Sequence, residues 1–380
     1  MELYFDNSAT TKPYDSVIEV MSRAMREYWG NPSSLHTKGY EAEKKLTEAR
    51  KVILDSLNIR DTHSEIFFTS GGTEADNLAL MGTMRAKARN KGKKLITTKS
   101  EHPAILNTAK QLEAEGFEVV YLSCRGGRVD INEYMAALDK NTVMVSIMTV
   151  NNETGAVYDL KKLFTMAKAV SPDIVTHTDA VQAYMKLRLS PEAMKCDMMT
   201  LSGHKIHGPK GIGALYVSAE CMKKRTLSPH TFGGGQEKGF RSGTENLPAI
   251  LGFAEAARAG VYPSSVGKLR EYILKSLPAE IRPNIPATAA PHILNVTLPG
   301  IKSETMLHFL SSKGIYVSSG SACSSNSGHA NYVLPDFGLT DKEADSSIRL
   351  SLDASLTVDD ANILINALQE GLDTLVRSSK

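Results

Sequence analysis

The segment SGHKIHGPKGIG, residues 202–213, places Lys205 between two histidines in a loop of glycine, proline and small polar residues. A lysine at a strand end with apolar neighbours can lose its proton more readily than one in water, and the neutral amine can bond covalently to a carbonyl group. Two other interpretations stay open for this segment alone: Lys205 is a solvated surface residue, or His204 and His207 bind a metal ion. The metal interpretation lacks the H-E-x-x-H spacing and a nearby acidic ligand, so we expect no metal.

Glycines and a predicted helix start follow the apolar run EIFF, residues 65–68. Gly72 would let the backbone approach an anion, and a helix beginning near Thr73 would offer free N–H groups to a phosphate. An ordinary capped turn, with Thr73 and Asp76 as a capping box, explains the same residues. The segment has neither the Walker nor the dinucleotide-binding glycine pattern.

Two further apolar runs end in His102 and Asn152. The imidazole of His102 could stack on a flat cofactor and exchange protons near neutral pH, although a lone histidine is more often structural. The amide of Asn152 could orient a polar ligand, or could simply belong to the turn before Gly155.

Asp179 ends the run IVTHTD, and Gln182 follows at a spacing that shares one helical face. A carboxylate in a sheet crevice needs a cationic partner, because isolated buried charge is costly. A protonated pyridine nitrogen would meet this need, and so would a structural salt bridge. Together, a phosphate seat, a histidine, amides, an acid and a lysine are what pyridoxal phosphate requires from a protein.

Short apolar runs alternate with longer amphipathic stretches between about residues 64 and 220. This pattern predicts an α/β fold with a large, doubly wound, mostly parallel sheet of seven strands. The runs are EIFFTS, KLITTKS, EVVYLS, TVMVSIMTV, DIVTHTD, DMMTLS and GIGALYVS. Ligands of such sheets bind beyond the carboxyl ends of the strands, which is where the polar endings described above lie.

The pattern changes near residue 257 to a smaller α+β unit, which ends in a helix from about Val358 that Thr357 and Asp360 cap. We expect a large cofactor-binding domain at 14–256. The small domain would combine residues 1–13 with residues 257–380.

The composition excludes several classes of function. The 44 basic and 42 acidic side chains are mixed along the 380 residues and leave a formal net charge of +2, so a nucleic-acid partner is not expected. No apolar run approaches the roughly 20 residues that cross a bilayer, and the N-terminal segment has no secretory pattern. The cysteines Cys124, Cys196, Cys221 and Cys323 are too scattered for a disulfide framework. We expect a cytoplasmic protein without a membrane partner.

Ten segments, spread over nearly the whole chain, resemble the class V, fold-type I pyridoxal-phosphate family, and most closely its cysteine desulfurases. They are YFDNSATT, NPSSLH, FFTSGGTEADN, SEHPAIL, VNNETG, HTDAVQ, SGHKIHGPKGIGALYV, GGGQEKGFRSGTEN, SSGSACSS and SSIRLSL. The interval between SGSAC and SSIR resembles the long-loop branch of that family.

The resemblance implies a role for each polar strand ending. Lys205 would hold the cofactor, pyridoxal 5'-phosphate, covalently. Asp179 would pair with the pyridine nitrogen, Gln182 would bond the ring oxygen, and His102 would stack on the ring and assist proton transfer. The phosphate would be held by the backbone and side chains of Gly72, Thr73, Ser202 and His204.

The resemblance also implies a homodimer, because a threonine of the second subunit completes the phosphate site in this family, here Thr244. Arg349 would clamp the substrate carboxylate with its planar guanidinium. Asn152 and Asn31 would help to bind the substrate, and Asn152 would also contact the cofactor.

Cys323 is the residue to which the resemblance assigns the sulfur chemistry. L-cysteine would become L-alanine while Cys323 takes the sulfur as a persulfide, for delivery to a protein acceptor such as an iron–sulfur scaffold or a sulfur carrier. A single cysteine is more often a passive hydrophobe, but its small, polar, glycine-containing surroundings are unlike a core. A selenocysteine lyase, another class V enzyme and a non-enzymatic assembly scaffold are the alternatives.

The chain departs from the family pattern at Asp353 and Ala354, where many relatives carry glycine and arginine. It also stops soon after the final predicted helix. Both departures leave the identity of the sulfur acceptor open.

Overall fold

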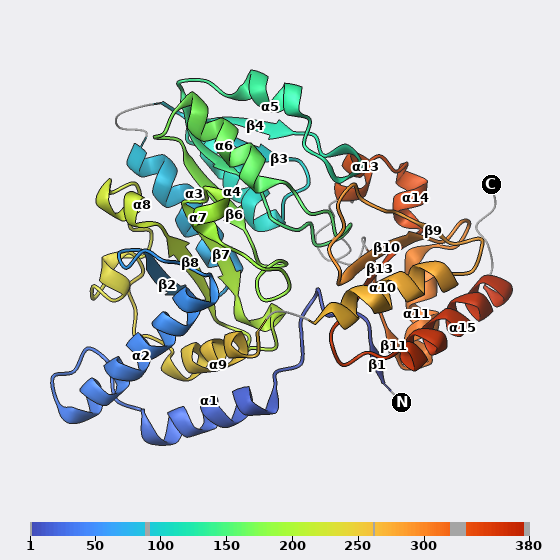
Figure 1. Cartoon of the computed structure of the whole chain (residues 1–380), viewed down its shortest axis with the longest axis horizontal. Helices are drawn as coiled ribbons and strands as arrows, with labels where there is room; N and C mark the ends of the chain where they lie inside the picture. Colours follow the sequence, from blue (N-terminus) through green and yellow to red (C-terminus); the bar gives the residue numbers. More distant parts are fainter. Residues whose placement is uncertain (1, 88–91, 261–262, 320–331, 376–380) are drawn as a thin grey trace.

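Seven strands form the largest sheet of the computed structural model, which describes residues 2–87, 92–260, 263–319 and 332–375 (Figure 1). In spatial order they are β2 (Glu65–Thr69), β8 (Gly213–Val217), β7 (Met198–Ser202), β6 (Val175–Asp179), β5 (Thr142–Ser146), β3 (Lys94–Thr98) and β4 (Glu118–Leu122). In this sheet β8 runs antiparallel to both of its neighbours, and the other pairings are parallel. The predicted α/β class and the mostly parallel seven-stranded sheet are confirmed.

Helices cover both faces of this sheet, which explains why its strands are almost continuously apolar. Ile66 and Phe68 of β2 join one core, whereas Phe67 between them joins another. The first core includes side chains of α2 (Thr37–Ser56), α6 (Leu160–Val170) and α9 (Leu247–Arg258), and the second includes those of α3 (Gly72–Lys87) and α4 (Pro103–Ala114). Since successive strand residues point to opposite faces, burying both faces favours apolar side chains at most positions, and each large one contributes about 1.5–3 kcal/mol.

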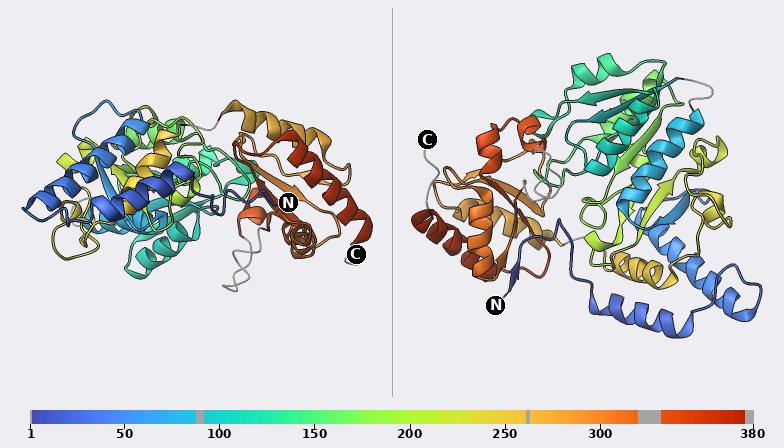
Figure 2. Two further views of the ribbon diagram at one scale, coloured as in Figure 1. Left: turned by 90° about the horizontal axis from the view of Figure 1, so that it is seen from below. Right: turned by 180° about the vertical axis from the view of Figure 1, so that it is seen from behind.

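The C-terminal part of the chain forms a separate body beside the large sheet (Figure 2). Its sheet has the order β12 (Ser318–Ser319), β13 (Ser347–Ser351), β10 (Ile293–Thr297) and β9 (Arg282–Pro283), and α10 (Ser264–Ser276), α11 (Ser303–Ser312) and α15 (Val358–Thr374) pack with it. The N-terminal strand β1 (Leu3–Tyr4) pairs with β11 (Ile315–Tyr316), and Leu3 and Phe5 are buried in this second body. The exact domain limits remain a prediction. The predicted capping box at the start of α15 is present, since Thr357 and Asp360 bond each other's backbone N–H groups.

The other helices lie between these elements. They are α1 (Asp15–Glu27), α5 (Ile131–Ala137), α7 (Pro191–Met194), α8 (Ala219–Lys223), α13 (Val333–Phe337), α14 (Asp341–Asp345), and the 3-10 turns η1 (Arg125–Gly127), η2 (Gly203–Lys205) and η3 (Glu237–Gly239). Asp336 of α13 accepts hydrogen bonds from Ser123 Oγ at 2.9 Å and from Cys124 N at 2.8 Å, and so ties the small body to the end of β4. Among the helices that the structure describes, none is long and apolar enough to span a membrane.

Candidate active site

Lys205 lies one short 3-10 turn beyond the carboxyl end of β7. Its Nζ donates to the carbonyl oxygens of Ser8 at 2.6 Å and Ala9 at 2.7 Å, so the N-terminal segment crosses the end of the large sheet. The turn is tight because Gly203 has no side chain: a Cβ there would lie 2.8 Å from Ile212 Cγ2. The chain therefore delivers an amine to the sheet edge where parallel α/β folds bind ligands.

Asp179 is the last residue of β6, the strand next to β7, and is buried. Its Oδ1 accepts the N–H of Val181 at 2.8 Å. Burial raises the pKa of this carboxyl to about 6, although the Val181 hydrogen bond and the Lys205 charge both oppose the shift. Asp179 is thus an acid that can face a cation close to neutral pH.

Two more buried acids lie near Asp179, and the sequence reasoning did not identify either as functional. Glu101 is fully buried; its Oε1 accepts from Thr98 Oγ1 at 2.8 Å and Met148 N at 2.9 Å, and its Oε2 has no hydrogen-bond partner among the described residues. Burial raises the Glu101 pKa to about 8. Burial and the nearby Asp179 charge also hold the pKa of Asp76 well above its usual range, so Asp76 is a core acid and not the helix cap considered above. The only sequence signal for Asp76 was its place in the segment GGTEADN, which follows a predicted strand.

His102 caps the start of α4 from the end of the β3 connection. Its Nδ1 accepts the N–H of Ala104 at 3.2 Å, so the neutral ring carries its hydrogen on Nε2. Although the side chain is exposed at the surface, the surrounding protein and the Lys205 charge lower its pKa to about 4. At neutral pH His102 is therefore an uncharged ring with an Nε2–H donor, suited to stacking on a flat group and donating a hydrogen bond.

The four predicted phosphate contacts lie at two strand ends. Ser202 ends β7, and its buried Oγ has no hydrogen-bond partner among the described residues. Gly72 starts α3, where a Cβ would lie 2.9 Å from Val181 Cγ2, and Thr73 is exposed in the first turn. The His204 Nδ1 lies 3.2 Å from Thr10 Oγ1, and burial, with the Lys205 charge next, lowers the His204 pKa to about 4.

Gln182 is buried and both ends of its amide have partners. Nε2 donates to the Ser8 carbonyl at 2.9 Å, and Oε1 accepts from Nζ of Lys186 at 3.1 Å. Lys186 was not singled out from the sequence, because a lysine is ordinarily solvated. The structure buries it beside the site.

Arg349 occupies the middle of β13 and is almost completely buried. Its Nη2 lies 2.7 Å from Asp6 Oδ1, and its Nη1 donates to the backbone carbonyl of Asn152 at 2.9 Å. Nε has no partner among the described residues. The structure thus brings Arg349 and Asn152 together, but through a backbone carbonyl and not through the predicted amide.

Two predicted site residues, Asn31 and Thr244, lie in exposed connections. Asn31 is exposed in the connection between α1 and α2, where its Oδ1 accepts Ser33 N at 2.9 Å, and Figure 1 places this connection on the side of the molecule away from β13. Thr244 is exposed in the loop between η3 and α9. The loop that carries Thr244 is tied to the first turn of α3, because Arg241 pairs with Glu74 at 2.8 Å.

Cys323 lies outside the described residues, so the structure gives no account of it. The other three cysteines, Cys124, Cys196 and Cys221, are buried, and burial raises the pKa of each thiol. A protonated, buried thiol is a poor nucleophile, so none of these three suits sulfur chemistry.

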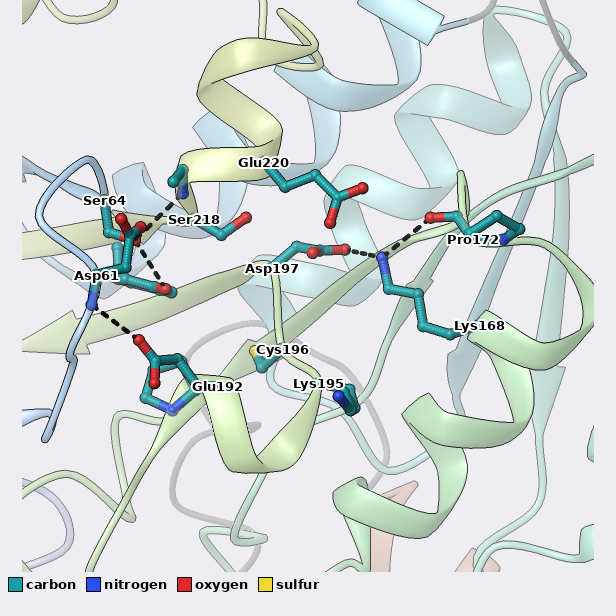
Figure 3. A pocket seen from close by; sticks show the side chains of 13 residues that line it. Asp61, Ser64, Lys168, Pro172, Glu192, Lys195, Cys196, Asp197, Ser218 and Glu220 are labelled. Carbon is teal, nitrogen blue, oxygen red and sulfur yellow. Dashed lines mark hydrogen bonds and ion pairs between the residues drawn. The ribbon is translucent and has the colours of Figure 1, made fainter.

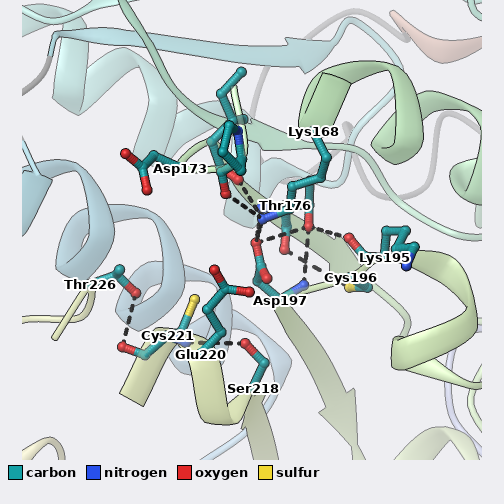
Figure 4. A network of polar contacts seen from close by, with 12 residues as sticks. Lys168, Asp173, Thr176, Lys195, Cys196, Asp197, Ser218, Glu220, Cys221 and Thr226 are labelled. Carbon is teal, nitrogen blue, oxygen red and sulfur yellow. Dashed lines mark hydrogen bonds and ion pairs between the residues drawn. The ribbon is translucent and has the colours of Figure 1, made fainter. Parts of the chain in front are cut away.

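A cavity of about 470 Å³ lies at the opposite edge of the large sheet, where β7 begins and β8 ends (Figure 3). Its acidic side chains and Lys168 already have protein partners. Asp197 pairs with Lys168 and also accepts the N–H of Thr176 at 2.9 Å (Figure 4), while Glu192 accepts the backbone N–H groups of Arg60 and Asp61. The described part of the chain contains no group of histidine, cysteine or acidic side chains arranged for a metal ion.

Comparison with known proteins shows that the similarity to one family extends over nearly the whole chain. The aminotransferase class-V family model matches residues 3–364. A NifS/IcsS protein homolog from Lactobacillus delbrueckii subsp. bulgaricus is 42% identical over 97% of this chain and 96% of its own length. The cysteine desulfurase IscS of Klebsiella pneumoniae is 40% identical over 99% of this chain and 94% of its own length.

Solved structures agree with these relatives. A NifS-like protein superposes with a TM-score of 0.91 at 34% identity, covering 99% of this chain and 100% of the other. SspA in complex with cysteine superposes with a TM-score of 0.82 at 34% identity, covering 92% and 99%. A lysine and a buried acid at neighbouring strand ends suit an enzyme that acts on amines through a cofactor with a carbonyl group. The chain belongs to the aminotransferase class-V family, and within it to the group of cysteine desulfurases.

Proposed function

We propose that this protein is a pyridoxal-phosphate-dependent cysteine desulfurase, which converts L-cysteine to L-alanine and transfers the sulfur to Cys323. The observation that carries the proposal is the meeting of Lys205, Asp179 and His102 at one edge of the sheet, where the His102 ring is neutral and the buried carboxyl of Asp179 can face a cation. The full-length similarity to cysteine desulfurases supports the same reaction.

The residues at this edge fit pyridoxal 5'-phosphate. The orphaned Oγ of Ser202, the N-terminus of α3 and the space kept by Gly72 suit a phosphate. Asp179 suits the pyridine nitrogen, the neutral ring of His102 suits a face of the cofactor, and Lys205 supplies the amine. When bound, the cofactor would bond to the substrate amine and withdraw electrons from its Cα.

The chain's own groups would carry the proton steps. Lys205 Nζ, released when the substrate amine takes its place, would remove the proton from the substrate Cα. Asp179 would keep a proton on the ring nitrogen, and the Nε2–H of His102 would donate a hydrogen bond across the ring. Arg349 would hold the substrate carboxylate by a charge-assisted pair.

Cys323 would then act as nucleophile. Its thiolate attacks the substrate sulfur: an S–S bond forms and the substrate C–S bond breaks. The electron pair of the broken bond would stay with the carbon skeleton, which would take up one proton at Cβ, regain at Cα the proton that Lys205 removed, and leave as L-alanine, while Cys323 would keep the sulfur as a persulfide. A protein sulfur acceptor, such as an iron–sulfur scaffold or a sulfur carrier, would receive it.

We also propose a cytoplasmic homodimer in which Thr244 completes the phosphate site of the partner. Large apolar side chains are exposed on α1, the following connection and α2, and at the glycine-rich loop near Thr244: Ile18, Met25, Trp29, Leu35, Tyr40 and Phe232. A group of exposed apolar side chains of this size is typical of an interface.

A single-turnover experiment tests the proposal. The holoenzyme is mixed with L-cysteine without reductant, and we expect one alanine and one persulfide for each Cys323. Cys323→Ala should keep the cofactor's visible absorbance and lose persulfide formation, whereas the matched control Cys221→Ala should retain both. Full persulfide delivery by Cys323→Ala would contradict the carrier role, and turnover of selenocysteine without turnover of cysteine would favour a selenocysteine lyase.

A further inference from the structure

Lys186 is a buried lysine directly behind the site, with 2% of its surface exposed. Its Nζ donates to Oε1 of Gln182 at 3.1 Å. Burial holds its pKa well below the usual range, and the nearby charges of Lys205 and Arg349 add to this shift, while Asp353 opposes it. Burying a lysine amine costs free energy of desolvation, so we asked what its contact with Gln182 does for the site.

The contacts of Lys186 set the direction of one amide. An amine nitrogen donates to Oε1, so the nitrogen end of the Gln182 amide points the other way, where it donates to the Ser8 carbonyl at 2.9 Å. The same carbonyl accepts Nζ of Lys205 at 2.6 Å. Three side chains, Lys186, Gln182 and Lys205, are therefore joined in one chain of hydrogen bonds.

The amide nitrogen of Gln182 carries two hydrogens, and the Ser8 carbonyl takes one of them. The second has no other acceptor among the described residues. It is the donor that Gln182 can offer to a bound molecule. If Lys186 were absent, the buried Oε1 would lose its donor, and only the Ser8 carbonyl would still hold the amide, so the amide could tilt and its second N–H would no longer keep one direction.

We propose that Lys186 is a positioning residue: it holds the Gln182 amide with its N–H donor toward the ring oxygen of the bound cofactor. This assignment rests on the proposed function, because it takes pyridoxal 5'-phosphate as the ligand. It explains why the chain keeps an amine where an apolar side chain of the same length would cost less to bury.

The test compares cofactor binding by the apoprotein with binding of an analogue that lacks only the ring oxygen, 3-deoxypyridoxal 5'-phosphate. The dissociation constants are measured by equilibrium dialysis for the wild type and for Lys186→Met, which keeps the side-chain length and removes the donor. We expect Lys186→Met to raise the dissociation constant of pyridoxal 5'-phosphate about tenfold and that of the analogue less than twofold. Only pyridoxal 5'-phosphate has the ring oxygen to which Gln182 would donate a hydrogen bond.

Lys94→Met is the matched control, since Lys94 is also buried but pairs with Asp139 at the far end of β3. It should alter neither constant. Thermal unfolding of the apoprotein is measured in parallel to show that Lys186→Met folds; a variant with Gln182→Leu, which removes the amide, should reproduce the selective loss.

Equal weakening of both ligands by Lys186→Met would mean that Lys186 supports only the packing of the site, and the assignment would be wrong. No change for either ligand would overturn it as well. If the wild type binds neither compound, the proposed function itself fails and the role of Lys186 fails with it, and the wild-type measurement identifies that case.

Discussion

The two edges of the large sheet carry similar polar side chains, but these side chains differ in whether they have hydrogen-bond partners. At the edge where β7 begins, Lys168 and Asp197 pair with each other, and the remaining bonds of Asp197 go to Thr176. At the edge where β7 ends, Ser202 Oγ and one oxygen of Glu101 are buried without a hydrogen-bond partner among the described residues.

This difference separates a structural network from a binding site. A buried polar group without a partner costs about 1–3 kcal/mol, so a folded protein keeps one where a ligand restores the missing bond. The presence of a cavity alone does not make this distinction, because the cavity at the opposite edge is lined by Lys168, Asp197 and Glu192, which already have protein partners. Changes at the two edges should therefore affect different measurements.

The largest effect should come from Lys205→Ala. Removing the amine that would bind the cofactor and carry the Cα proton should lower kcat by at least about 10³-fold and abolish the holoenzyme's visible absorbance. The matched control is Lys210→Ala, an exposed lysine of the same segment, which should leave both unchanged. Near-normal turnover by Lys205→Ala would contradict the placement of the active site at the edge where β7 ends.

Arg349→Ala should weaken substrate binding next. Loss of a buried guanidinium facing a carboxylate is expected to raise KM for L-cysteine about 100-fold, and Arg349→Lys should recover only part of it. Exposed Arg258 serves as the control, since Arg258→Ala loses only a surface pair with Glu255. An unchanged KM with lowered stability would show that Arg349 serves only its pair with Asp6.

Asp197→Asn should act on stability alone. The change leaves the partly buried Lys168 ammonium without its carboxylate, and the free energy of unfolding should fall by about 2–3 kcal/mol in urea titrations. Steady-state kinetics of the folded variant should match the wild type. A selective loss of kcat would mean that the two edges are coupled.

Glu101→Gln should show the smallest effect, in the pH dependence of stability. The folded pKa of about 8 lies above the ordinary 4.5, so the folded state binds the extra proton between these values and its stability falls as pH rises through them. Glutamine does not titrate. The variant should therefore gain at least about 1 kcal/mol over the wild type between pH 5 and pH 8, with exposed Glu370→Gln as control. Parallel stability curves would contradict the raised pKa.

Much of this could be predicted from the sequence. All seven strands of the large sheet were predicted from short runs rich in apolar and β-branched residues, because strands buried on both faces are mostly apolar; β6 is the exception, with buried Thr176, His177 and Thr178. The capping box of α15 was also read correctly, since it depends on only four consecutive residues. Lys205 and Asp179 were both predicted at the edge where the parallel strands end, but only the structure shows that their strands are adjacent.

Other features needed contacts between distant segments. Lys186, Glu101 and Asp76 look like ordinary polar residues in the sequence, and their importance follows from burial that several elements create together. Asn152 was chosen for its amide, but its backbone carbonyl meets Arg349 from β13. Asp353, a departure from the family pattern, is buried and lies 3.8 Å from Nε2 of His207, a contact across distant segments.

The sequence by itself determined the strands, their order of polar endings and the types of group available for chemistry, because periodicity and strand ends are local properties of the chain. Only the tertiary structure decided which of these groups are paired and which are left for a ligand. That outcome depends on desolvation and on partners that come from far apart, such as the Ser8 carbonyl that joins Gln182 to Lys205.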